Sequence, residues 1–137
     1  MGEALSLADA AIAVGEVPVG AVVVRQGKII GRGHNRTRID RDPTAHAEIV
    51  AIRQATRFLG NDRLEDCDLW VTLEPCTMCA GAIAHARIAR LYYGADDPKG
   101  GAIESGVRFF DAPTCHHRPD IYAGMEGERS AKMLLDF

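Results

Sequence analysis

The sequence predicts a three-layer α/β/α sandwich built around a central five-stranded mixed sheet. Two observations carry this prediction. Short apolar runs rich in β-branched residues alternate along the chain with longer segments of helical periodicity, an order that places helices against a mostly parallel sheet. No repeat, low-complexity tract or linker interrupts the 137 residues, so residues 1–137 are predicted to form one continuous domain.

The first elements are a helix and a pair of strands. Apolar residues recur at helical spacing over residues 1–14, and Gly15 is a typical end for that helix. Residues 20–24 form an unbroken apolar run typical of a buried strand, and a tight turn leads into a second strand, 28–35, paired with the first. Residues 36–43 are charged and show no periodicity, which indicates an exposed loop.

The second helix is predicted over about residues 45–59. Pro43 suits a first helical turn, and either Asp42 or Thr44 can cap the helix N-terminus. Gly60 is typical of the residue that follows a helix.

The remaining elements continue the alternation. A third strand is predicted over 69–73, a third helix from Pro75 to about residue 86, and a fourth strand over 91–93. The pattern is weaker beyond this point, where residues 121–122 indicate a short fifth strand and 126–137 a final helix.

Composition excludes several classes of protein. The chain is 47% apolar and 26% charged, and its net charge of −3 excludes a protein that coats nucleic acid by bulk charge, although a small local RNA site is compatible with it. No apolar run is long enough to span a bilayer, and no signal peptide is apparent. A domain of this size needs no disulfides, so we expect a cytoplasmic protein whose four cysteines are reduced.

Two short motifs carry the chemistry. His46 precedes Glu48 in an H-x-E motif, and a P-C-x-x-C motif with Cys76 and Cys79 follows after 26 intervening residues. Each motif falls at a predicted helix N-terminus, where the helix dipole favours thiolates. Two thiolates and one imidazole are good ligands for Zn²⁺, and a site with three protein ligands keeps a fourth position open for water. The motifs therefore predict a catalytic zinc site.

Glu48 is placed to act as a general acid/base. In a regular helix, positions two apart point in nearly opposite directions, so His46 and Glu48 can converge only in the first turn, around a group beyond the helix end. The carboxylate of Glu48 would then lie beside zinc-activated water without binding the metal, and would carry protons to a ring nitrogen and to the leaving amine.

With these motifs, the sequence resembles the zinc-dependent cytidine/deoxycytidylate deaminase superfamily, whose signature is H-x-E followed by P-C-x-x-C. Within it, the chain is most similar to bacterial tRNA-specific adenosine deaminases, and the resemblance covers nearly the whole chain. The segments that carry it are residues 16–21 (EVPVGA), 34–36 (HNR), 42–48 (DPTAHAE), 71–82 (VTLEPCTMCAGA) and 93–95 (YGA).

The resemblance implies a cytidine-deaminase-like fold and a homodimer that converts the wobble adenosine of a tRNA anticodon loop to inosine. It also implies roles for further residues. Asn35 would hydrogen-bond the purine, Asp97 would contact the flanking nucleotide, and the backbone around Ala47 and around Pro75 and Cys76 would help hold the flipped base. The stretch His116, His117 and Arg118 would line the path of the RNA. Such deaminases usually continue past the position of Phe137 into a basic tail, so trimmed or disordered ends, or a shortened RNA contact surface, are expected here.

Other interpretations remain open. Cys76 and Cys79 can belong to a structural zinc site with a fourth ligand from Cys67, Cys115 or His116 and His117, and the domain would then be a catalytically silent zinc or RNA-binding module. A thioredoxin-like redox pair lacks a matching motif. Among enzymes, the alternative is a deaminase of a free base or nucleoside such as guanine or cytosine. Cys67 is predicted to be a small core residue, and Cys115 either packs in a loop or makes a contact.

Overall fold

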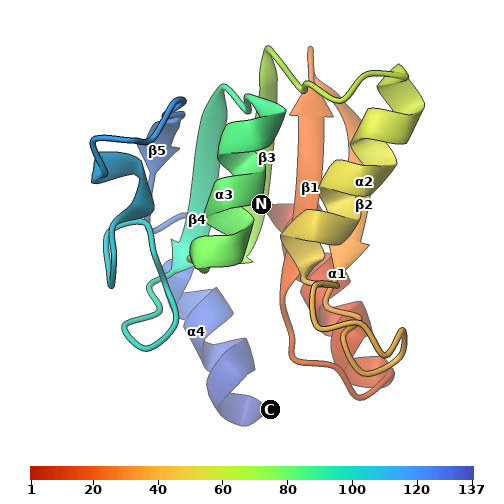
Figure 1. Cartoon of the computed structure of the whole chain (residues 1–137). Coiled ribbons are helices and arrows are strands. Elements are labelled where there is room, and N and C mark those ends of the chain that lie inside the picture. Colours follow the sequence, from red (N-terminus) through yellow and green to blue (C-terminus); the bar gives the residue numbers. More distant parts are fainter.

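The chain folds into five strands and four helices arranged in three layers (Figure 1), which confirms the predicted fold class. A computed structural model describes all 137 residues. The strands are β1 (Gly20–Arg25), β2 (Lys28–His34), β3 (Cys67–Leu73), β4 (Arg90–Ala95) and β5 (Asp120–Tyr122). The helices are α1 (Gly2–Ala13), α2 (Ala47–Leu59), α3 (Thr77–Ala86) and α4 (Gly127–Asp136), with a short 3-10 turn, η1 (Phe109–Asp111). None of these helices has the length and apolarity needed to cross a lipid bilayer.

The sheet is mixed, with strand order β2-β1-β3-β4-β5. β1 pairs antiparallel with both β2 and β3, whereas β3, β4 and β5 are parallel to one another. The expectation of a mostly parallel sheet is therefore wrong, because two of the four pairings are antiparallel. The physical reason is that β1 lies between β2 and β3, so the strands joined by the α2 crossover are parallel but are not neighbours.

The N-terminus of α2 differs from its predicted form. The helix begins at Ala47, and neither Asp42 nor Thr44 caps it. Instead, an Asp42 carboxylate oxygen accepts hydrogen bonds from the backbone N–H (2.9 Å) and hydroxyl (2.7 Å) of Thr44, which stabilise a turn ahead of the helix. The N-cap residue is His46, whose backbone is extended and whose side chain makes no capping bond. The imidazole is therefore free to point beyond the helix end.

The N-terminus of α3 has the same arrangement. Pro75, predicted to open this helix, precedes it, and Cys76 is the N-cap residue, with extended backbone and no capping bond from its side chain. The predicted glycine at the end of α2 is confirmed, since Gly60 adopts the left-handed conformation, with φ of 66°. The predicted strands are all present, and β3 and β4 are each longer than predicted.

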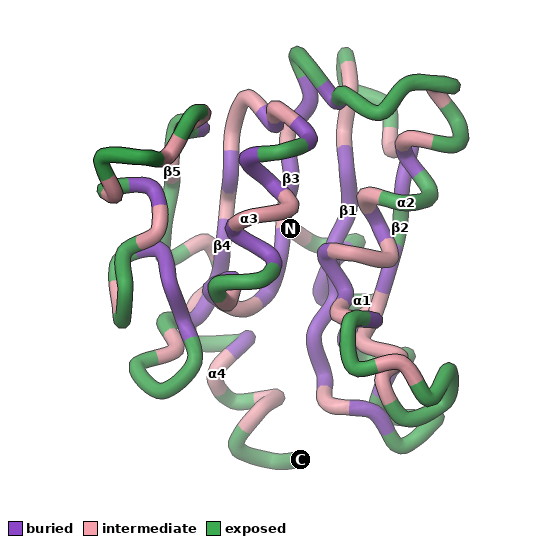
Figure 2. Tube along the Cα trace, viewed as in Figure 1, coloured by how far each residue is buried: buried purple, intermediate pink, exposed green.

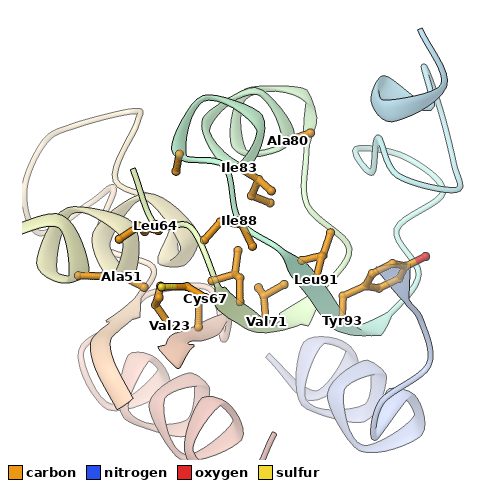
Figure 3. Packing of buried hydrophobic residues seen from close by; sticks show 14 of the residues in the cluster. Val23, Ala51, Leu64, Cys67, Val71, Ala80, Ile83, Ile88, Leu91 and Tyr93 are labelled. Atoms are coloured by element: carbon orange, nitrogen blue, oxygen red, sulfur yellow. The ribbon is translucent and has the colours of Figure 1, made fainter. Parts of the chain in front are cut away.

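The helices cover both faces of the sheet. α2 and α3 lie on one face, and α1 and α4 lie on the other (Figure 1). Burial follows the sheet and the inward helix sides, while loops and outer helix surfaces are exposed (Figure 2). In the core between the sheet and α3, Val71 and Leu91 lie beneath Ile83 and Ile88 (Figure 3). Cys67 is fully buried in this core, as predicted.

Gly33 of β2 allows a close approach between the sheet and α2. A Cβ atom at this position would lie 2.5 Å from the carbonyl oxygen of Ala47 and 2.8 Å from the backbone nitrogen of Ala51. Only glycine therefore allows the first turns of α2 to approach the sheet this closely.

We expect Gly33→Ala to lower the free energy of unfolding by about 1–3 kcal/mol, because the methyl group must displace the backbone of α2. Chemical denaturation measures this loss. Gly81→Ala is the matched control, since the nearest atom to its Cβ, Phe109 Cζ, is 4.0 Å away. This variant should gain up to about 1 kcal/mol from helix propensity. Equal stability of the two variants would contradict the role assigned to Gly33.

Candidate active site

The N-termini of α2 and α3 point to the same edge of the sheet, the lower edge in Figure 1, where loops from two parts of the chain flank them. A cavity of about 300 Å³ opens there. Its lining residues are Val17, Val19, Asn35, His46, Ala47, Glu48, Leu73, Glu74, Cys76, Asp97 and Gly100. Residues from five separate segments of the chain thus converge on one cavity.

Three predicted metal ligands lie together at this cavity. The Nδ1 atom of His46 is 3.6 Å from Sγ of Cys76 and 3.5 Å from Sγ of Cys79, and the three ligand atoms lie within 4.8 Å of one another. Tetrahedral zinc with Zn–S of about 2.3 Å and Zn–N of about 2.0–2.1 Å requires N···S separations of about 3.5–3.6 Å. The two N···S separations therefore match those of a tetrahedral zinc site.

The protonation equilibria of this cluster also suit a cation. The hydrogen bond from the Cys79 thiol lowers the pKa of Cys76 to about 4, and the same bond raises the pKa of Cys79. The hydrogen bond with Cys76 raises the pKa of His46. Cys76 is thus held as a thiolate, the form in which cysteine binds metal. The protons on Cys79 and His46 stabilise its negative charge, as a bound metal ion would.

Glu48 lies in the first turn of α2, beside His46 in the wall of the cavity. Its side chain is only 4% exposed, and this burial raises the pKa of its carboxyl group. Because His46 stands outside the helix as its N-cap, the imidazole and the carboxylate face one cavity despite their i, i+2 spacing. This is the first-turn geometry that the sequence predicts for an H-x-E pair.

The structure brings three of the predicted substrate-binding residues to the cavity: Asn35, Ala47 and Asp97. Asn35 and Asp97 are half-buried and come from the ends of β2 and β4. Pro75 is buried behind the cavity, where its carbonyl oxygen accepts a hydrogen bond from the backbone N–H of Ala102 at 2.9 Å.

The other two predicted contact residues lie away from the cavity. The Nε2 atom of His117 is 2.6 Å from the carbonyl oxygen of Ile88, and Arg118 forms an ion pair with Asp111. Neither residue lines the cavity, so their role along an RNA path stays a prediction. The sequence gives no sign of these local partners, because both are brought close by tertiary packing.

No second metal-binding cluster is present. His46, Cys76 and Cys79 are the only group of three or more His, Cys, Asp or Glu side chains close enough to hold an ion. Cys67 lies in the core, and the thiol of Cys115 donates a hydrogen bond to the carbonyl oxygen of His117 at 3.1 Å. None of the candidates for a fourth protein ligand thus lies in the cluster of His46, Cys76 and Cys79. This favours a metal site with an open coordination position over a structural zinc site.

Two buried glutamates near the cavity were not predicted from the sequence. Glu16 and Glu74 are 0% and 2% exposed, and both accept hydrogen bonds from backbone N–H groups of loops that border the cavity. Sequence periodicity cannot reveal a buried carboxylate of this kind, because its partners are backbone groups. Glu16 and Glu74 do fall within segments that carry the family resemblance, which was the one available signal.

Comparison with known proteins gives consistent results. Residues 1–124 match the MafB19-like deaminase family. The "tRNA-specific adenosine deaminase" of Agrobacterium fabrum is 63% identical over 122 residues, which cover 89% of this chain and 80% of the relative. The protein of the same name from Rickettsia bellii is 49% identical, with 100% of this chain and 96% of the relative covered.

Solved structures extend the comparison. One, described as a study of A-to-I editing by tRNA:A34 deaminases at the wobble position of transfer RNA, superposes with a TM-score of 0.96 at 60% identity, with 98% of this chain and 97% of that chain covered. The guanine deaminase of Bacillus subtilis superposes with a TM-score of 0.69 at 35% identity, with 99% and 91% covered. The chain therefore belongs to the MafB19-like deaminase family, among the proteins named tRNA-specific adenosine deaminases.

Proposed function

We propose that this protein is a zinc-dependent hydrolytic deaminase that converts adenosine to inosine at the wobble position of a tRNA anticodon loop. The observation that carries the proposal is the buried carboxylate of Glu48 beside a His/Cys/Cys cluster in one cavity. The identity of 60–63% with a tRNA-specific adenosine deaminase and with a structure of a tRNA:A34 deaminase supports the choice of substrate.

His46, Cys76 and Cys79 would hold the zinc ion, since their ligand atoms have the required separations. When bound, zinc lowers the pKa of water to about 7 and so supplies a nucleophile near neutral pH. Glu48 accepts the proton that the attacking water loses, delivers it to a ring nitrogen of adenine, and then helps protonate the amine that leaves as ammonia. Its burial raises its pKa, which suits a group that both accepts and donates protons.

The remaining cavity residues bind the base. Asn35 offers an amide donor and acceptor to the purine edge, and the first backbone N–H groups of α2 and α3, near Ala47 and Cys76, face the same space. The cavity of about 300 Å³ is large enough for one extruded base. An unpaired loop nucleotide costs least to flip, which favours an anticodon loop as substrate. Pro75 would act only by fixing the backbone there.

The partners and location follow from this function. We propose an anticodon stem-loop as the RNA partner, a homodimer as the active assembly and the cytoplasm as the compartment. Light scattering of the purified protein measures whether one chain or two are present. The His117 and Arg118 region is proposed to extend the RNA contact beyond the cavity.

We expect an anticodon stem-loop with a wobble adenosine to release ammonia, and free guanine, cytosine and adenosine to release none at equal concentration. The guanine deaminase similarity supplies the competing function, because the metal-site chemistry is common to both activities. Turnover of a free base alone would overturn the tRNA assignment. A zinc ion found by X-ray absorption spectroscopy to have four protein ligands would overturn catalysis itself.

A further inference from the structure

The carboxylate of Glu74 accepts five hydrogen bonds from the loop formed by residues 97–105, here called the 97–105 loop. Oε1 accepts hydrogen bonds from the backbone N–H of Asp97 and the hydroxyl of Ser105, both at 2.9 Å. Oε2 accepts bonds from the backbone N–H groups of Ile103 (3.0 Å), Glu104 (2.9 Å) and Ser105 (2.9 Å). Both ends of the loop are thus bound to one side chain that is 2% exposed.

The loop is built around this carboxylate. A Cβ atom at Gly101 would lie 2.6 Å from Cδ of Glu74 and 2.5 Å from the carbonyl oxygen of Asp97, so the backbone passes directly against the acid. Within the loop, Oδ1 of Asp97 accepts bonds from the N–H groups of Lys99 (3.1 Å) and Gly100 (3.0 Å). These bonds turn the chain but do not attach it to the sheet, whereas Glu74 does.

Glu74 also connects this loop to the metal-binding end of α3. Its own N–H donates to the carbonyl oxygen of Ala95 at 2.9 Å, and the next residue, Pro75, accepts a bond from Ala102. The backbone then continues directly into Cys76. One short segment therefore fixes both a predicted zinc ligand and the loop that places Asp97 in the cavity wall.

The charge of Glu74 is satisfied without any cation. No Lys, Arg or His forms an ion pair with it, and its partners are four backbone N–H groups and one hydroxyl. Bonds of this type are short and charge-assisted, and they demand an acceptor at both carboxylate oxygens. An amide cannot meet this demand, because its NH₂ group would face N–H donors.

We propose that Glu74 is a positioning residue for substrate recognition: it holds the 97–105 loop in the conformation that presents Asp97 to the nucleotide flanking the edited base. The proposal rests on the proposed function for the identity of the substrate. Glu74 itself does not touch the reacting atoms.

The test combines loop dynamics with a double-mutant cycle. In Glu74→Gln, amide hydrogen exchange should accelerate in residues 97–105, while zinc content stays at one ion per chain. KM for the anticodon stem-loop should rise by about 10- to 100-fold with kcat changed much less, as Asp97→Ala should also show. The double variant should be hardly worse than either single variant, because Glu74 acts through Asp97.

Two controls separate this role from general destabilisation. Leu64→Ala removes a fully buried core side chain before β3, outside the cavity, and should lower stability with KM unchanged. Glu16→Gln makes the same chemical change at another buried carboxylate, which accepts bonds from the N–H groups of Arg38 (3.0 Å) and Ile39 (2.8 Å), and should not accelerate exchange in the 97–105 loop.

The outcomes are distinguishable. If the wild-type protein deaminates the stem-loop but the effects of Glu74→Gln and Asp97→Ala on KM multiply, the positioning role is overturned and the proposed function stands. Unchanged exchange in the 97–105 loop of Glu74→Gln overturns it equally. If the wild-type protein ignores the stem-loop, the proposed function fails, and the assignment of Glu74 to tRNA recognition fails with it.

Discussion

Glu48→Ala is expected to reduce deamination of the anticodon stem-loop by about 10²–10⁴-fold while the protein retains its zinc. The reduction follows from the loss of the proposed general acid/base, a role worth that factor in typical enzymes. Zinc should be retained because the substitution leaves the proposed ligands His46, Cys76 and Cys79 in place. Ammonia release and metal analysis of the same sample measure the two quantities.

Glu48→Gln sharpens this prediction. Because the Glu48 side chain is 4% exposed, alanine leaves a void, whereas glutamine keeps the volume and removes only the ability to exchange protons. Both variants should therefore lose about 10²–10⁴-fold in deamination activity, and Glu48→Gln should unfold at nearly the wild-type denaturant concentration. Activity that survives in Glu48→Gln would show that another group carries the protons.

Cys79→Ala is expected to abolish zinc binding at stoichiometric concentration and, with it, all measurable deamination. Removing one of three protein ligands leaves only His46 and Cys76, and catalytic zinc sites in proteins keep three. Treatment of the wild-type protein with a chelator should have the same effect, and added zinc should restore activity to the chelated protein but not to the variant.

Cys67→Ala provides the matched control for this loss. Cys67 is also a buried thiol, but it lies at the start of β3 in the hydrophobic core and outside the metal cluster. The variant should keep one zinc ion and full activity, with a small loss of stability from the missing sulfur. Loss of zinc from Cys67→Ala as well would contradict the assigned ligand set.

The sequence predicted the elements of the fold well because their signals are local. The β-branched run of β1, the glycine after α2 and the alternation of strands with helices all act within a few residues. The pairing of β1 with β3 was not predictable in this way, because strand order depends on which faces must be buried together. The prediction that Asp42 or Thr44 caps α2 was wrong because His46 takes the N-cap position, as Cys76 does in α3, and neither side chain makes a capping bond. Both are residues of the proposed metal site, where local capping preference does not decide the residue type.

The site was predictable to the same extent. The H-x-E and P-C-x-x-C motifs predicted that His46, Glu48 and both cysteines lie close together, because spacing at a helix end determines where these side chains point. The sequence did not predict a role for Glu74, because its side chain makes five hydrogen bonds with residues 23 to 31 positions away. The sequence also gave no sign that the ring of His117 lies 2.6 Å from the carbonyl oxygen of Ile88, and the RNA contact that the family resemblance implies for His117 stays a prediction.

Because the proposed ligands lie at the ends of two helices, a bound metal ion would also stabilise the fold. His46, the N-cap residue of α2, forms one side of the cluster. Cys76 and Cys79, at the start of α3, form the other side and lie 30 and 33 residues further along the chain. A metal ion held there ties α2 to α3 across a loop whose closure by a disulfide is worth roughly 3–4 kcal/mol. Although the chain contains no disulfide, the proposed zinc ion would thus act as a reversible cross-link whose strength depends on zinc supply. Zinc depletion would therefore abolish catalysis and lower the stability of the fold at the same time.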